Sequence, residues 1–152
     1  MDTNVLALIG MGLMLGLSAA GAGAGFFIVG STAIGVIKKK PESFGNVLVL
    51  SAVPSSQGLY GFVAFIMYNG AVTGLAPNLS PFGGAVILGA GIAVGLACMV
   101  TCIYQAKICA SGVSAIGDGH NVLGNTLILA AFPEFFAILS LVASILMLPM
   151  VK

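Results

Sequence analysis

The sequence predicts an all-α membrane protein with four transmembrane helices that derive from a duplicated helical hairpin. The first reason is composition: 59% of the 152 residues are hydrophobic, only 6% are charged, and the mean hydropathy is +1.17, which is typical of a chain that lies in lipid. The second reason is a series of four long apolar segments, and the third is an internal repeat. Because a span takes about 20 residues, we expect residues 1–152 to form a single membrane domain without a soluble part.

The apolar segments predict the helices in order, and turn-forming residues separate them. The first connection contains three lysines and Pro41, the second runs from Thr73 to Pro81 with two prolines, and the third is Gly-Asp-Gly-His at 117–120. The first and third segments have about 34 residues, roughly 50 Å as helix, so we expect them to tilt or to project beyond a hydrocarbon core of about 30 Å. The segments are Asn4 to Ile37, Phe44 to Val72, Phe82 to Ile116 and Asn121 to Met147.

Charge predicts the orientation in the membrane. Lys38, Lys39 and Lys40 lie in the first connection, and the second connection has no lysine. By the positive-inside rule, the first and third loops are cytoplasmic and both termini face the other side. Asp2 stands where a secretory signal would be basic, so we expect the first helix to be retained. A net charge of +1 provides no basic surface, which argues against nucleic acid as a partner.

The chain repeats itself at an offset of 79 residues (123 − 44 = 79). Residues 44–54 (FGNVLVLSAVP) correspond to residues 123–133 (LGNTLILAAFP). Because each copy has an even number of spans, both copies insert in the same orientation, and we predict a first hairpin over residues 1–75 and a second over residues 82–152. Glu134 corresponds to Ser55, so the duplication predicts one carboxylate and one site per chain.

Glycine pairs in the first and third helices indicate close helix packing. Pairs spaced by four residues let two backbones approach, which is how helices gain contact in lipid. The pairs fit packing inside one four-helix bundle, but their number favours a larger assembly. They are Gly12 with Gly16, Gly21 with Gly25, and Gly91 with Gly95.

Glu134 lies in the middle of an otherwise uncharged apolar segment, residues 121–147. A carboxylate at such a depth costs roughly 2.5 to 3.5 kcal/mol on insertion scales, so a functional role is the first hypothesis. We interpret it as an ion-binding group. The alternative is a protonated carboxyl with a structural role.

A polar stripe on the second helix supplies further candidate ligands. Val53, Ser56, Gln57 and Tyr60 are spaced i, i+3, i+4 and i+7, which places them on one helix face. Pro54 removes a backbone donor, so neighbouring carbonyls become candidate cation ligands, and we expect Pro133 to act in the same way in the fourth helix.

Three polar residues from three helices lie at one depth. Gln57 is 17 residues past Lys40, Gln105 is 13 before Asp118, and Glu134 is 16 past Asp118, a spread of about 6 Å. One carboxylate, two amide oxygens, a hydroxyl and a carbonyl would form an all-oxygen cation site, and the single negative charge favours a monovalent ion. Either glutamine alone would fit an interhelical hydrogen bond better, but both at the depth of Glu134 favour the ion site.

These motifs carry a resemblance to a known family. The run Pro54 to Phe62 (PSSQGLYGF), the Gln105-Ala106-Lys107 stretch and the helix with Glu134 resemble the proteolipid rotor subunit of V-type and A-type ATPases, the c or K subunit, most closely its bacterial sodium-translocating members. The resemblance covers nearly the whole chain. It implies a homo-oligomeric ring in a bacterial cell membrane, which has no catalytic activity of its own and turns as ATP is hydrolysed.

The resemblance also implies ligands and partners. The Na⁺ ligands would be Ser56, Gln57, Gln105, Glu134 and the backbone carbonyl of Val53. Tyr60 would form a hydrogen bond with the carboxylate. Since the chain has no arginine, a stator membrane subunit would supply the cationic group that displaces the ion, central-stalk subunits would contact the cytoplasmic loops, and lipid would surround the ring.

Two other functions remain open at the level of sequence. A rotor that carries H⁺ instead of Na⁺ would need only Glu134, because polar neighbours can also form hydrogen bonds with a protonated acid. A stand-alone channel or carrier with four spans would form a small oligomer with an aqueous path. Cys98, Cys102 and Cys109 all lie on the third helix, where we expect them to be packing residues and not metal ligands.

Overall fold

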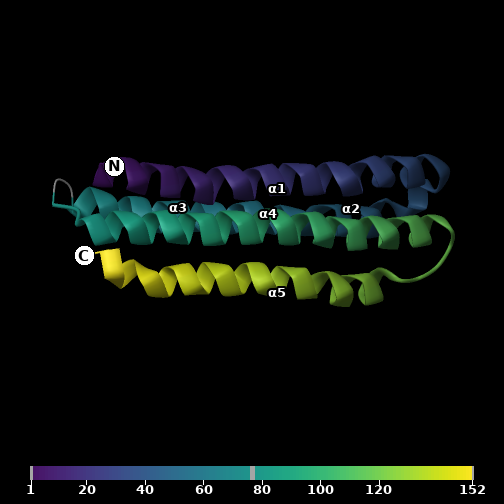
Figure 1. The fold of residues 1–152 in the computed structure, drawn as a ribbon. Coiled ribbons are helices and arrows are strands. Elements are labelled where there is room, and N and C mark those ends of the chain that lie inside the picture. Colours follow the sequence, from purple (N-terminus) through teal and green to yellow (C-terminus); the bar gives the residue numbers. More distant parts are fainter. Residues whose placement is uncertain (1, 76–77, 152) are drawn as a thin grey trace.

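The computed structural model describes residues 2–75 and 78–151, and that part of the chain is helical except for short connections and contains no strand (Figure 1). Four stretches of the described residues are long and apolar enough to cross a membrane: Thr3–Lys39, Pro41–Leu75, Pro81–Gly117 and Leu123–Val151. This confirms the predicted all-α fold with four spans. In chain order the elements are α1 (Thr3–Lys39), the 3₁₀ turn η1 (Pro41–Ser43), α2 (Phe44–Ala52), the 3₁₀ turn η2 (Val53–Ser55), α3 (Ser56–Leu75), α4 (Pro81–Gly117), α5 (Leu123–Met147) and the 3₁₀ turn η3 (Leu148–Val151).

Helices α1, α3 and α4 extend beyond the apolar segments that predict them, whereas helix α5 stays within its segment. Helices α1 and α4 have 37 residues each, about 55 Å at 1.5 Å per residue. At its C-terminal end, helix α1 continues through Lys38 and Lys39. These two residues are not apolar, so they lie outside the apolar segment, but lysine has a high helix propensity. In the predicted second connection, Ala76 and Pro77 lie outside the described residues.

Local capping chemistry explains both ends of helix α4. Its N-cap Ser80 accepts a hydrogen bond from the Gly83 amide at 3.0 Å, and Pro81 occupies the first helical position. At the other end the His120 amide donates to the Ala115 carbonyl, and Gly119 has a φ of +99°. A left-handed residue after the last turn is the usual helix stop, and glycine adopts it without strain.

The spans lie side by side, and both described chain ends are at one end of the bundle (Figure 1). Helix α1 packs most extensively on helix α4. The packing is close because a Cβ atom at Gly91 would meet the backbone of Gly10, and one at Gly21 would lie 2.5 Å from the Cα atom of Met99. Glycine there allows the direct backbone contact that stabilises helix pairs in lipid.

The glycine pairs divide into two groups. Gly21, Gly25, Gly91 and Gly95 all face neighbouring helices of the same chain, whereas Cβ atoms at Gly12 and Gly16 would meet no atom within 4 Å among the described residues. Packing within one bundle therefore explains two pairs. The third pair leaves a strip of small residues open on the outer face of helix α1.

The buried apolar residues form two clusters with a polar layer between them. One cluster, toward the described chain ends, includes Met14, Tyr68 and Ile87. The other, toward the loops, includes Val29 and Val113. Gln57 and Gln105 have no exposed surface and lie at the level between the two clusters. The fold thus places buried polar groups near the middle of the spans, as the residue counts from the loops predict.

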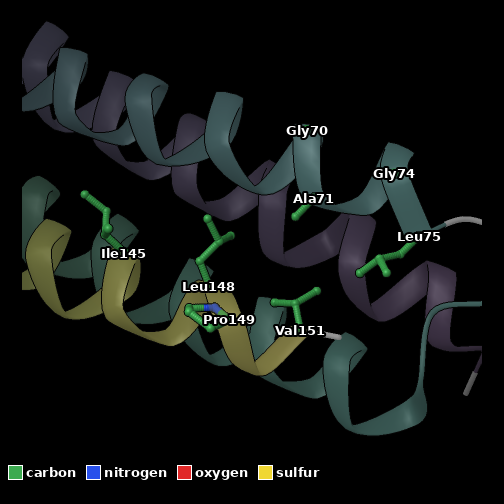
Figure 2. Close-up of a pocket in the computed structure, with 8 residues that line it drawn as sticks. All are labelled: Gly70, Ala71, Gly74, Leu75, Ile145, Leu148, Pro149 and Val151. Carbon is green, nitrogen blue, oxygen red and sulfur yellow. The ribbon is translucent and has the colours of Figure 1, made fainter.

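A pocket opens near the described chain ends, between the end of helix α3 and turn η3 (Figure 2). It is lined by glycine, proline and aliphatic residues, so it offers no side chain that could bind an ion. Ile145, the lining residue nearest to Glu134 along the chain, is 11 residues away, which is about 16 Å of helix. We conclude that this pocket is separate from the candidate site. Its lining residues are Gly70, Ala71, Gly74, Leu75, Ile145, Leu148, Pro149 and Val151.

The contact between helices α1 and α4 generates a stability prediction. Replacing Gly91 by alanine forces the two backbones apart, and overpacking of this kind costs roughly 1 to 3 kcal/mol. We expect the G91A variant to have a lower midpoint of thermal unfolding in detergent. The matched control is G45A, because a Cβ atom at Gly45 meets nothing within 4 Å in the described structure and alanine favours a helix by about 1 kcal/mol. Equal midpoints for the two variants would contradict the described contact.

Candidate ion-binding site

Glu134 on helix α5 is half-buried and accepts hydrogen bonds from three side chains. Ser56 Oγ and Tyr60 OH, both on helix α3, donate to Glu134 Oε1 at 2.7 and 2.6 Å. Gln105 Nε2, on helix α4, donates to Glu134 Oε2 at 2.9 Å. A charge that leaves water must be hydrogen-bonded or paired, and bonds to a charged acceptor are the strong ones. Donors on helices α3 and α4 thus replace water around the carboxylate of helix α5.

The two glutamines connect this carboxylate to the interior. Gln57 Nε2 donates to Gln105 Oε1 at 3.0 Å, and Gln105 Nε2 also donates to the Ala130 carbonyl at 2.9 Å. Thr101 Oγ1 donates to Gln57 Oε1 at 2.5 Å. The result is a continuous series of hydrogen bonds from Thr101 through both amides to Glu134, which satisfies all four polar ends of two buried amides.

The backbone near Pro54 adds a carbonyl to the cluster. Pro54 has no N–H to donate to the Leu50 carbonyl, and residues Val53–Ser55 form the 3₁₀ turn η2 at this point. Ser56 Oγ lies 3.0 Å from the Val53 carbonyl. The departure from α-helix therefore occurs where the sequence predicts it, next to the carboxylate.

Pro133 behaves differently from Pro54. Helix α5 remains α-helical from Leu123 to Met147 with Pro133 inside it. The 3₁₀ turn that accompanies Pro54 therefore has no counterpart at Pro133, although we expected the two prolines to act in the same way. A proline removes only one hydrogen bond from the ladder, and the acceptor that it leaves is the carbonyl of Leu129, an exposed residue.

The six residues predicted for the site come together in one cluster. The sequence-based prediction of the site includes neither Thr101 nor the Ala130 carbonyl. The spacing contains a signal for both, since Thr101 precedes Gln105 by four residues and Ala130 precedes Glu134 by four. The six are Val53, Ser56, Gln57, Tyr60, Gln105 and Glu134.

Other residues from the sequence analysis lie around this cluster. The three cysteines are buried and free, and Cys102 Sγ contacts the Pro54 carbonyl at 2.9 Å, which fits the expected packing role. Ser55, the counterpart of Glu134 in the repeat, is exposed in turn η2. Lys107 is exposed, with its Nζ atom 5.5 Å from the centre of the Tyr104 ring.

Comparison with known proteins reveals a family match and two similar relatives. The family model for the C subunit of ATP synthase matches the chain twice, over residues 9–68 and 88–147, and the two matches are offset by 79 residues (88 − 9 = 79), as in the sequence repeat. The A-type ATP synthase subunit K of Methanocaldococcus jannaschii is 32% identical over 147 residues, which cover 97% of this chain and 63% of the relative. The V-type sodium ATPase subunit K of Enterococcus hirae is 31% identical over 144 residues, which cover 94% of this chain and 90% of the relative. The chain therefore spans less than two thirds of the Methanocaldococcus jannaschii relative.

The geometry predicts the effect of removing one amide. In a Q105L variant, Glu134 loses a donor and Gln57 Nε2 loses its acceptor. Leaving buried polar groups unpaired costs about 1 to 3 kcal/mol, so we expect a lower free energy of unfolding in detergent titrations. The control is Y104F at the neighbouring exposed position, for which we expect a change within about 0.5 kcal/mol. If both variants unfold alike, the hydrogen bonds of Gln105 do not stabilise the bundle.

Proposed function

The chain belongs to the family of ATP synthase C subunits and, from this premise, we propose that it is the ion-carrying rotor subunit of a V/A-type ATPase, in which each copy binds one Na⁺ at Glu134. It has no catalytic activity of its own. The whole chain forms a single membrane domain of two hairpins, over residues 1–75 and 82–152, and many copies assemble into a ring. The Enterococcus hirae relative is by name a sodium ATPase subunit, which supports the choice of ion.

One observation carries the proposal: the side chains and the backbone carbonyl of the candidate ligands cluster around Glu134. The Val53 carbonyl, Ser56 Oγ and Glu134 Oε1 are joined by contacts of 3.0 and 2.7 Å, and the amides of Gln57 and Gln105 complete the cluster. Carboxylate, amide, hydroxyl and carbonyl oxygens are hard ligands that suit Na⁺. The residues therefore fit this cargo, and Tyr60 orients the carboxylate from outside the ligand set.

Charge neutrality then couples ion loading to rotation. With one Na⁺ bound, the single carboxylate has no net charge and can face lipid, whereas the bare carboxylate is too costly there. A copy must therefore be loaded before it turns into the hydrocarbon. Because the chain has no arginine, a stator membrane subunit provides the cationic group that displaces the ion.

The two ends of the bundle have different roles in this proposal. The α1–α2 and α4–α5 connections lie at the end opposite the described chain ends (Figure 1). Lys38 and Lys39 end helix α1 and Lys40 follows in the first connection, while Asp118 and His120 lie in the second. We assign this end to the cytoplasm of a bacterial cell, where central-stalk subunits contact the loops.

The open face of helix α1 supports assembly into a ring. A Cβ atom at Gly12 or Gly16 would meet no other helix within 4 Å in the described chain, and large apolar side chains such as Phe27 and Leu146 are more than two thirds exposed. A strip of small residues admits a second helix at close range, so we assign it to the contact with the next copy, and the apolar side chains to neighbouring copies and lipid.

The sodium proposal is tested by carbodiimide labelling of Glu134. A carbodiimide reacts with a protonated carboxyl group, so a bound cation protects that group. At fixed pH we expect NaCl to slow the labelling of the detergent-extracted assembly, measured by mass spectrometry, and KCl of the same ionic strength to have little effect. The E134Q variant gives the background labelling. Labelling that is indifferent to NaCl would favour H⁺ as the cargo.

The ring is tested by the mass of the extracted assembly. A rotor predicts one large closed oligomer and no conductance from the purified chain, whereas a stand-alone channel or carrier predicts a small oligomer that conducts. We expect native mass spectrometry and particle images to show the large ring. A G16L variant adds bulk to the open face of helix α1 and should lower the yield of rings. A wild-type assembly of only a few copies would count against a rotor.

A further inference from the structure

The hydrogen bonds between Thr101 and Glu134 all have the same direction. Thr101 donates to Gln57 Oε1, Gln57 Nε2 donates to Gln105 Oε1, and Gln105 Nε2 donates to Glu134 Oε2. In this direction an N–H group of Gln105 faces the carboxylate, and each amide oxygen already accepts a hydrogen bond. A cation between Gln105 and Glu134 requires the opposite arrangement, with Gln105 Oε1 toward the carboxylate.

The two amides must turn together. An amide presents a donor at one end and an acceptor at the other. If Gln105 alone turned over, its NH₂ group would face the NH₂ group of Gln57, and both side chains are fully buried. Turning both reverses the series: Gln105 Nε2 donates to Gln57 Oε1, which keeps a second lone pair for an ion, and Gln57 Nε2 points to Thr101.

Thr101 is the group that can serve both directions. Its hydroxyl has one proton and two acceptors in reach, Gln57 Oε1 at 2.5 Å and the Ala97 carbonyl at 2.6 Å. When the proton goes to Gln57, the series has the direction described above. When it goes to Ala97, the hydroxyl oxygen is free to accept from Gln57 Nε2, because a hydroxyl both donates and accepts.

We propose that Thr101 is a positioning residue of the ion site, whose hydroxyl lets the amides of Gln57 and Gln105 reverse together and present oxygen to Na⁺. The inference rests on the proposed function. Thr101 touches neither the carboxylate nor the ion, and it acts through Gln57. Without the hydroxyl, the reversed arrangement leaves a buried N–H group unpaired, and orphaned buried N–H groups are tolerated less well than orphaned carbonyls.

The test measures the NaCl concentration that halves carbodiimide labelling of Glu134 in the extracted assembly, a binding readout that does not depend on ATPase activity. We expect T101V, which keeps the shape but lacks the hydroxyl, to raise that concentration about five- to tenfold. T101S keeps the hydroxyl and should stay within about twofold of wild type. The control is T126V, because among the described residues the buried Thr126 hydroxyl donates only to the carbonyl of Val122, the N-cap residue of its own helix.

The possible results separate the two proposals. Protection of wild type by NaCl with an unchanged value for T101V overturns the role of Thr101 and leaves the sodium rotor standing. An equal rise for T101V and T101S also overturns it, because packing and not the hydroxyl would be responsible. No protection of wild type by NaCl overturns the sodium proposal itself.

A second measurement needs no variant and covers the case in which T101V does not assemble. The infrared difference spectrum of wild type between NaCl and choline chloride should contain shifted carbonyl bands of glutamine side chains, since both amides change partners. Side-chain amide bands that are the same in both salts overturn the reversal.

Discussion

The cost of a carboxylate in hydrocarbon determines the arrangement of this bundle. Glu134 is kept at mid-span only because helices α3 and α4 bring donors to both of its oxygens. One of these donors, Gln105, is itself a buried polar group whose amide oxygen needs a donor, so the hydrogen bonds continue inward through Gln57 to Thr101. The polar layer and the two apolar clusters on either side of it follow from this single charge.

Close packing of helices α1 and α4 provides the rigid side of the site. Their backbones touch at Gly10 and Gly91, which fixes helix α4 and therefore the position of Gln105. Helix α5 is attached on the other side, in part by the hydrogen bond from Tyr68 OH to the Ser144 carbonyl at 2.7 Å. The carboxylate on helix α5 can thus meet donors on helices α3 and α4, because separate contacts hold α4 against α1 and α5 against α3.

Sequence reasoning predicted the all-α fold with four spans, because hydropathy and turn residues are strong signals in membrane chains. Counting residues from the loops also predicted that Gln57, Gln105 and Glu134 meet, since the rise per residue of a helix is constant. It could not assign Thr101 a role, because that depends on the orientation of one amide relative to another helix. Nor could it tell which glycine pairs face a neighbour within the chain, since the same spacing suits either face, as Gly16 and Gly95 show.

The exposed Ser55 of turn η2 has a consequence for energy conversion in the proposed rotor. The first hairpin has this hydroxyl where the second has Glu134, so a ring of a given number of spans moves half as many ions per revolution as one with a carboxylate in every hairpin. For the same ATP consumed per revolution, each ion then receives twice the free energy. The proposed rotor would therefore move fewer ions per revolution, each against a steeper gradient.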